Sequence, residues 1–457
     1  MVSVPRIVVA APASGQGKTS VATGLLAAFR ARGLEVSPHK VGPDYIDPGY
    51  HTLAAGRPGR NLDPWLVGED RIGPMFAHGA RTPKPVDIAV VEGVMGLFDG
   101  TSARGEFAST AHVARLLAAP IVLVVDASGV ARSVGALVHG FARFDPNVRI
   151  GGIVFNRVGS AGHAAILREA VEPMGIPVLG LIHRQESLAV PSRHLGLVPV
   201  AERSAEAVAV VEELGRVIAA SVNLDAVLRL ARTAAELPDD VDAPSADPPT
   251  PRVRIALAAG SAFTFGYAEH PELLRAAGAE VVTFDPLTDE HLPPDVDGLV
   301  IGGGFPEVHA VDLSGNLPLR TQIAELARSG APVIAECAGL LYLGRTLDGH
   351  EMCGVLDSDA VMTERLTLGY REAVAPADSA LVAAGSRVRG HEFHRTSVTA
   401  SAGVQPAWQW RMLRETVSEG IVQGGVHASY LHVHWAGIPG AAERIVGACV
   451  RRRSIAS

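Results

Sequence analysis

The stretch that decides the fold is residues 7–20, IVVAAPASGQGKTS. Its first residues are apolar, as in a buried strand, and a turn of serine and glycine then leads to Lys18 and Thr19. Apolar residues recur at helical spacing after this turn, so a helix is expected to begin there. A strand, a glycine turn and a helix N-terminus together make a cradle for phosphate, because backbone N–H groups and the helix dipole point at the anion.

We expect this turn to bind ATP. The residues predicted to do so are Ser14, Gly15, Gln16, Gly17, Lys18, Thr19 and Ser20. The side chain of Lys18 adds a positive charge, and the hydroxyl of Thr19 can hold Mg²⁺. The usual phosphate-loop pattern has glycine where this chain has Pro12. The strand before the turn and the helix after it nevertheless favour nucleotide binding over an ordinary turn with a buried lysine.

Length and composition limit the remaining possibilities. A chain of 457 residues suggests two or three domains. The composition, 47% hydrophobic and 19% charged, is typical of a globular protein. The net charge of −8 argues against a nucleic-acid partner.

The cysteines and the N-terminus indicate where the chain works. Cys337, Cys353 and Cys449 are too few and too scattered for a disulfide framework or a zinc site, so we expect the reducing cytoplasm. The N-terminus lacks the pattern of a signal peptide. Because no apolar run is long enough to span a bilayer, we expect no membrane association.

The first half alternates apolar runs with helical patterns, which predicts a parallel sheet covered by helices on both faces. The apolar runs are residues 7–11, 34–36, 87–91, 121–125 and 150–155. The clearest helical patterns are residues 130–144 and 161–174. Ligands of such sheets bind beyond the carboxyl ends of the strands, and polar clusters follow several of these runs.

Carboxylates at that edge have a role if ATP binds, because Mg²⁺ needs hard oxygen ligands. Besides Thr19, we expect Glu92 as the first metal ligand and Asp44 as the second. The alternative for Glu92 is a helix-cap or turn acid.

Four further residues at the same edge are weaker predictions. Lys40, Asp47 and Asp99 are expected to act on the substrate or in phosphoryl transfer. The two aspartates lie in glycine- and proline-rich turns, where aspartate is common without catalysis, and Lys40 has the alternative of a solvated charge. Asn156 is expected to contact adenine through its amide, with a turn asparagine as the alternative.

A proline- and aspartate-rich segment divides the chain. Residues 234–251 read AAELPDDVDAPSADPPTP, a composition that cannot bury a core. We therefore expect an ATP-binding domain at 1–232, a linker at 233–251 and a second α/β domain at 252–457.

The second half contains a cysteine in the context of a nucleophile. A buried strand at 332–335 runs into Glu336 and Cys337 and turns straight into a helix. This order resembles a nucleophile elbow, in which the neighbouring helix N-terminus favours a thiolate. Backbone N–H groups of Ala338 and Gly303 are expected to form the oxyanion hole. The alternative is a buried structural thiol.

A cysteine nucleophile needs a base, and residues 427–435, HASYLHVHW, offer two. On a strand, His432 and His434 share a face; we expect His432 to pair with Cys337 and keep His434 as the alternative. A second histidine cluster at 390–396 could form a zinc site with them, but no zinc-ligand spacing supports it.

The motifs together resemble a known family. In order they are GPDYIDPGYH, VEGVMGLFDG, GGGFPE, AECAGLLYL, LGYR, GHEFH and ASYLHVH. This set is similar to the cobyrinic or hydrogenobyrinic acid a,c-diamide synthases of cobalamin biosynthesis, over nearly the whole chain. The resemblance implies a dethiobiotin-synthetase-like P-loop domain followed by a class I, triad-type glutamine amidotransferase domain.

The resemblance also implies a ligase mechanism. Cys337 would release ammonia from glutamine through a thioester, with His432 as base. ATP with Mg²⁺ would phosphorylate the a and c carboxylates of a corrin polycarboxylate, and ammonia would displace the phosphate. The sequence does not decide whether cobalt is present, which carboxylate reacts first, or how ammonia travels between the domains.

Three departures from the family pattern stand out. Ala338 follows the cysteine where the family has glycine, and Gly260 and Ser261 stand where it often has aspartate. No acidic residue two positions after His432 or His434 completes a triad. The oligomeric state is also undecided, with a homodimer kept as an expectation.

Two rival functions are kept. One is a cobyric acid synthase-like enzyme that amidates other corrin carboxylates. The other is a P-loop switch ATPase with an inactive amidotransferase domain; Ser14, where such ATPases carry a signature lysine, and the intact Cys337 and His432 argue against it.

Overall fold

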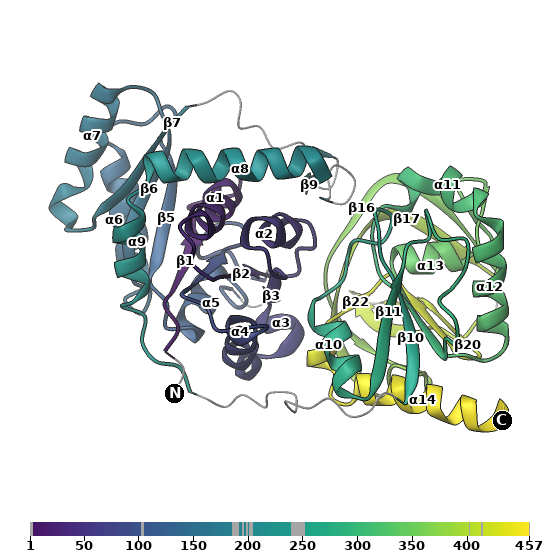
Figure 1. Ribbon diagram of the computed structural model, residues 1–457. Coiled ribbons are helices and arrows are strands. Elements are labelled where there is room, and N and C mark those ends of the chain that lie inside the picture. The colour runs from purple at the N-terminus through teal and green to yellow at the C-terminus, as the bar shows by residue number, and fades with distance from the viewer. Residues whose placement is uncertain are drawn as a thin grey trace. The chain divides into compact units, whose positions relative to one another are not determined.

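The computed structural model describes residues 3–101, 105–184, 192–193, 196–197, 200, 204–238, 252–401, 403–412 and 415–456 (Figure 1). Contacts divide the chain into two units, 1–242 and 243–457. Most of the predicted linker, 233–251, lies outside the described residues, so the two predicted boundaries, after residues 232 and 251, stay predictions.

The first unit alternates strands with helices. Its strands are β1 (Arg6–Ala10), β2 (Val36–Val41), β3 (Arg60–Leu62), β4 (Ile88–Glu92), β5 (Ile121–Asp126), β6 (Ile150–Val158), β7 (Val178–His183), β8 (Ser192–Arg193) and β9 (Gly196–Leu197). Its helices are α1 (Lys18–Ala31), α2 (Asp47–Ala55), α3 (Pro64–Val67), α4 (Ile72–Arg81), α5 (Thr110–Leu116), α6 (Val134–Phe144), α7 (Ala161–Val171), α8 (Ser204–Ser221) and α9 (Leu224–Ala231), with the 3₁₀ turns η1 (Glu69–Arg71) and η2 (Glu172–Met174).

Seven of these strands form one sheet in the order β3-β2-β4-β1-β5-β6-β7. Every pair in it is parallel. β1 and β4 are buried along their whole length, which explains why they are apolar almost throughout. The predicted parallel sheet is confirmed, and α1 runs beside α8 next to it (Figure 1).

Two predicted elements shift. The strand expected at 34–36 is instead β2, Val36–Val41. Its residues Ser37, His39 and Lys40 are buried although they are polar. The strand therefore lacks the run of apolar residues by which a buried strand is found in a sequence. The helix expected at 130–144 begins only at Val134.

The second unit contains two main sheets. Its strands are β10 (Val253–Ala258), β11 (Ala279–Phe284), β12 (Gly298–Ile301), β13 (Val333–Glu336), β14 (Thr346–Leu347), β15 (His350–Glu351), β16 (Ser358–Val374), β17 (Arg387–Ala400), β18 (Trp408–Met412), β19 (Glu415–Glu419), β20 (Ile421–Gln423), β21 (Val426–Ser429) and β22 (His432–Val433). Its helices are α10 (Glu269–Ala276), α11 (Ala310–Gly315), α12 (Leu317–Arg328), α13 (Ala338–Leu343) and α14 (Ala441–Ala456), with the 3₁₀ turns η5 (Pro306–His309) and η6 (Trp435–Gly437).

The first of these sheets has the order β11-β10-β12-β13-β21-β20 and is parallel except for β20. Alternate residues of its strands enter two separate cores. Val333 and Ala335 belong to one hydrophobic cluster, whereas Ile334 belongs to the other. A buried core on each face is what a mostly parallel sheet requires.

The segment that carries the candidate bases is not one strand. β21 belongs to the six-stranded sheet, whereas β22 pairs with β17 in the other sheet. β22 ends at Val433, and His434 lies outside it as the N-cap of η6. The prediction that His432 and His434 share a strand face is therefore wrong.

In the part of the chain that the structure describes, no helix is long and apolar enough to cross a membrane.

Candidate active sites

The turn between β1 and α1 has the geometry of a phosphate loop. Gly17 is the N-cap of α1 and has a φ of 97°, a conformation that residues with a side chain rarely adopt. A Cβ atom at this position would lie 2.3 Å from Asn156 Nδ2. Both the backbone angle and the close neighbour therefore favour glycine where the helix begins. Ser14, Gly15 and Gln16 precede Gly17 in the same turn, and Ser20 lies in the first turn of α1.

Asn156 holds this loop rather than facing away from it. Its Nδ2 donates to the backbone oxygen of Gln16 at 3.0 Å, and its Oδ1 accepts from the backbone N–H of Arg157 at 2.9 Å. The Gln16 side chain also accepts from the backbone N–H of Asp126 at 2.8 Å. Asn156 therefore anchors the loop, and its predicted contact with adenine stays a prediction.

Lys18 lies in the first turn of α1 and is mostly buried. Its Nζ donates to the backbone oxygen of Ala13 at 3.1 Å. Burial, together with the nearby charge of Lys40, lowers the pKa of Lys18 to about 8. The side chain is therefore poised to gain from contact with an anion.

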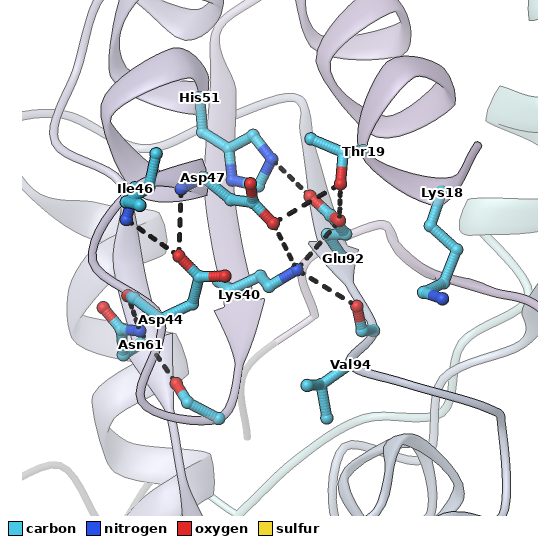
Figure 2. A network of polar contacts seen from close by, with 12 residues as sticks. Lys18, Thr19, Lys40, Asp44, Ile46, Asp47, His51, Asn61, Glu92 and Val94 are labelled. Atoms are coloured by element: carbon cyan, nitrogen blue, oxygen red, sulfur yellow. Dashed lines mark hydrogen bonds and ion pairs between the residues drawn. The ribbon is translucent and has the colours of Figure 1, made fainter. Parts of the chain in front are cut away.

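A buried polar network begins at Thr19, next to the phosphate loop (Figure 2). Thr19 Oγ1 donates to Glu92 Oε1 at 2.6 Å and lies 3.4 Å from Asp47 Oδ2. Lys40 Nζ lies between the two carboxylates, 2.7 Å from Asp47 Oδ2 and 2.8 Å from Glu92 Oε1. The structure thus brings together four of the predicted residues, from α1, β2, α2 and β4. The solvated alternative for Lys40 is excluded by its burial.

Lys40 and Glu92 stabilise each other's charge in this network. Burial alone would favour the neutral acid at Glu92, but Lys40 and His51 outweigh it and hold the pKa of Glu92 well below its usual range. Burial would likewise lower the pKa of Lys40, but the attraction of Asp47 and Glu92 raises it. Burial and the charge of Asp44 raise the pKa of Asp47.

His51 is a member of the network that sequence reasoning missed. Its Nε2 lies 2.7 Å from Glu92 Oε2, on the side of the carboxylate away from Thr19 and Lys40 (Figure 2). The sequence did contain a signal, because Asp47 and His51 are four residues apart on α2 and so share a helix face.

Asp44 and Asp99 have turn roles in the structure. Asp44 Oδ1 accepts from the backbone N–H groups of Ile46 and Asp47, at 2.8 and 3.0 Å. Asp99 Oδ2 accepts from the backbone N–H of Gly96 at 2.9 Å. Asp44 still lies close enough to act on the charges of Lys40 and Asp47.

The second unit holds Cys337 in a strained turn. Cys337 has a φ of 50° and a ψ of −101°, and it lies between the end of β13 and the start of α13. Its backbone N–H donates to the carbonyl of Ser429 on β21 at 2.7 Å. A positive φ at a residue with a side chain is costly and is typical of the nucleophile elbow.

His432 is the partner of this thiol. Cys337 interacts electrostatically with His432, which is fully buried on β22. A Cβ atom added at Gly303 would lie 2.5 Å from His432 Cε1 and 3.4 Å from Cys337 Cβ, so both side chains border the same point. Burial would lower the pKa of His432, but Cys337 and Glu336 raise it to about 10. The imidazole is thus stabilised in its protonated form next to Cys337. A positive charge beside the sulfur is what activates a cysteine nucleophile.

Of the two predicted oxyanion donors, Ala338 has an N–H group that can serve, whereas the N–H group of Gly303 is already used. Ala338 begins α13 directly after Cys337, and in the described part of the chain its N–H donates to no backbone carbonyl. Gly303 also lies at the site, since a Cβ there would be 2.5 Å from His432 Cε1. Its N–H, however, donates to the Phe265 carbonyl at 3.0 Å, so Gly303 is not the free donor that we expected.

His434 lies in a different cluster. Its Nε2 is 3.4 Å from Glu269 Oε2, and its ring packs against Tyr267 and His270, with centroid distances of 4.4 and 5.7 Å. The structure therefore favours His432 over His434 as the base. Nor do the described residues contain a group of three or more histidine, cysteine or acidic side chains placed to hold a metal, so the zinc alternative has no support.

These features define the class of protein: a P-loop nucleotide-binding domain followed by an amidotransferase-type domain. Residues 7–198 match the family model of the CobQ/CobB/MinD/ParA nucleotide binding domain. Residues 254–439 match that of the CobB/CobQ-like glutamine amidotransferase domain.

Whole-chain relatives narrow this class. The chain is 59% identical to the hydrogenobyrinate a,c-diamide synthase of Streptomyces coelicolor and 54% identical to that of Thermobifida fusca, each over 98% of both chains. It is 44% identical to the cobyrinate a,c-diamide synthase of Gloeobacter violaceus over 97% of both chains. The protein belongs to the hydrogenobyrinate/cobyrinate a,c-diamide synthase family.

Proposed function

We propose that this protein is an ATP- and glutamine-dependent ligase that converts the a and c carboxylates of a corrin into amides. The observation that carries the proposal is the presence of two chemically distinct sites in one chain. A phosphate loop with a buried Lys40–Glu92 network is joined to a Cys337–His432 pair. The family membership of the whole chain supports the same reaction.

The first site would activate the substrate. A carboxylate is a poor electrophile, and transfer of a phosphoryl group from ATP turns it into an acyl phosphate that ammonia can attack. Lys18 would contact the phosphates, and Lys40 would neutralise charge as the phosphoryl group moves. Asp47 and Asp99 remain the proposed residues of the substrate side.

Mg²⁺ belongs to the same proposal. Thr19 and Glu92 place a hydroxyl and a carboxylate oxygen 2.6 Å apart, and hard oxygens of this kind fit Mg²⁺. Asp44 remains the second candidate carboxylate. When bound, Mg²⁺ would neutralise and orient the phosphate oxygens of ATP.

The second site would release ammonia. The thiolate of Cys337 attacks the side-chain amide carbon of glutamine, and the Ala338 N–H stabilises the oxyanion. His432, protonated in the resting pair, gives its proton to the departing nitrogen, so that ammonia leaves and a glutamyl thioester remains. Water then hydrolyses the thioester to glutamate.

Cobalt-free hydrogenobyrinic acid is the substrate we favour. The relatives named for that substrate are 54–59% identical to this chain, whereas those named for cobyrinate are 40–44% identical. Mass spectrometry of products from matched cobalt-free and cobalt-containing diacids decides between the two.

Location and assembly complete the proposal. A cytoplasmic location is supported by Cys337, Cys353 and Cys449, which are all unpaired thiols. A homodimer is the assembly to test first, by sedimentation velocity.

The two sites can be separated by mutation. Cys337→Ala should abolish synthesis from glutamine but leave synthesis from added ammonia, because only the source of nitrogen is removed. Cys353→Ala is the matched control, since Cys353 is also a buried thiol but lies against Tyr342 and not against His432. Product formation is measured with each nitrogen source.

Glu92→Gln is expected to give the complementary result, loss of synthesis with either nitrogen source, because it removes the carboxylate that contacts Thr19 and Lys40. If ammonia fails to rescue Cys337→Ala, the two-site model is wrong. Glutaminase activity that is absent from the wild type, or unchanged by Cys337→Ala, would favour the switch-ATPase alternative for this chain.

A further inference from the structure

The carboxylate of Glu336 lies beside the imidazole of His432. Glu336 Oε2 is 3.6 Å from His432 Nδ1, and both side chains are buried. This separation is an ion-pair distance rather than that of a hydrogen bond, and the attraction grows when the imidazole is charged. A carboxylate at Nδ1 favours the tautomer with its proton there, which leaves Nε2 for the thiol of Cys337.

The elbow explains how two adjacent residues reach the same imidazole. In a regular strand, neighbouring side chains point to opposite faces of the sheet. Glu336 is the last residue of β13, but Cys337 leaves the strand with a φ of 50°. The strained turn therefore lets Glu336 and Cys337 both contact His432.

The other buried carboxylates of this region have partners of their own. Glu419 accepts from Ser429 Oγ and from the backbone N–H of Tyr430, each at 2.6 Å. Glu392 lies 2.6 Å from Arg371 Nε. The ion pair with His432 Nδ1 is made by Glu336.

We propose that Glu336 is the positioning residue that completes a Cys337–His432–Glu336 triad. It holds Nδ1–H of the imidazole toward itself and stabilises the imidazolium that forms when Cys337 gives its proton to Nε2. This inference rests on the proposed function, and it places the third triad member directly before the nucleophile in the chain, rather than after the histidine.

Glu336→Gln tests the proposal, because glutamine keeps the shape of the side chain and removes its charge. The expected result is a fall in kcat for glutamine hydrolysis of about 10⁴-fold, the size of the loss when the acid of a serine-protease triad is removed. KM for glutamine should be unchanged. Alkylation of Cys337 by iodoacetamide should move to higher pH, because the thiolate loses its imidazolium partner; a merely structural role of Glu336 would not cause this shift.

Glu269→Gln is the matched control. Glu269 is also a buried glutamate facing a histidine, at 3.4 Å, but its partner is His434. This variant should keep the kcat and the alkylation profile of the wild type. Glu336→Asp, which keeps the charge, should retain the pH dependence of the wild type with a reduced kcat; it serves as the second variant if Glu336→Gln does not fold.

The outcomes separate this inference from the proposed function. A Glu336→Gln variant with the kcat and alkylation profile of the wild type, in an enzyme whose glutaminase still depends on Cys337, overturns the role of Glu336 alone. An alkylation profile of Glu336→Asp that matches that of Glu336→Gln would also contradict it. Ammonia-dependent synthesis should be intact in every Glu336 variant, whereas its absence from the wild type would overturn the proposed function.

Discussion

At the scale of single residues, burial and charge decide the chemistry of both sites. Lys40 and Glu92 are almost completely buried, and each keeps its charge because the other is 2.8 Å away. Cys337 and His432 form the corresponding pair in the second unit. In both places, removing one partner leaves a buried charge without its counter-charge. We therefore expect single substitutions there to lower the free energy of unfolding more than substitutions at uncharged buried positions do.

The lowered pKa of Lys18 predicts a pH dependence of ATP binding. In the protein without ATP, the pKa of Lys18 is about 8, so this side chain loses its charge as the pH rises through 8. Bound phosphate favours the charged form, and the Kd for ATP should therefore rise about tenfold per pH unit above pH 8. Lys18→Arg, which stays charged, should show a flat profile. Isothermal titration between pH 7 and pH 9.5 measures both; a flat wild-type profile would contradict the assignment of Lys18.

Site residues could be predicted from the sequence where they lie in a local motif. The sequence predicted Thr19, Lys40, Asp47 and Glu92 as site residues, and the structure gathers them. His51 and Glu336 were missed, because their contacts, with Glu92 and with His432, join residues that are far apart in the chain. The N–H of Gly303 could not be judged from the sequence, since its acceptor, Phe265, lies 38 positions away in the chain (303 − 265).

At the scale of elements, helix α1 shows why a short motif predicts a whole domain. β1, the loop and α1 place Lys18 and Thr19 at the edge where β2 and β4 also end. The predicted elements that shifted were those with polar residues inside, such as β2, where burial depends on partners from other strands. The segment at 427–435 was read as one strand, but it crosses from one sheet to the other.

Gly17→Ala tests the geometry of this element. Alanine must adopt the unfavourable φ of 97° and displace the Asn156 amide, so unfolding should become easier by about 1–3 kcal/mol. ATP affinity should also fall, because the loop loses its anchor. Gly33→Ala is the control: Gly33 follows α1 with a φ of 82° but has open space around it.

Urea unfolding and ATP titration compare the two variants. Gly33→Ala is expected to lose some stability but to bind ATP as the wild type does. Equal ATP affinity in Gly17→Ala and the wild type would show that the loop geometry is not needed for binding.

At the scale of the whole molecule, the chain joins an activating site to a nitrogen-releasing site. The two-domain organisation was predictable, because each half carries its own motifs and the segment between them cannot form a core. The proposed third triad member, Glu336, was not predictable, because the pattern of related amidotransferases places the acid after the histidine. This division of labour predicts the origin of the amide nitrogen, which comes from glutamine, and of one oxygen of the released phosphate, which comes from the carboxylate.

The most direct test of this claim follows those atoms. Wild-type enzyme is given ATP, glutamine labelled with ¹⁵N in its side-chain amide, and hydrogenobyrinic acid labelled with ¹⁸O in its carboxylates, and the products are analysed by mass spectrometry. The account predicts ¹⁵N in both the a and c amides and one ¹⁸O in each phosphate released. Phosphate without ¹⁸O, or amides without ¹⁵N, would contradict it.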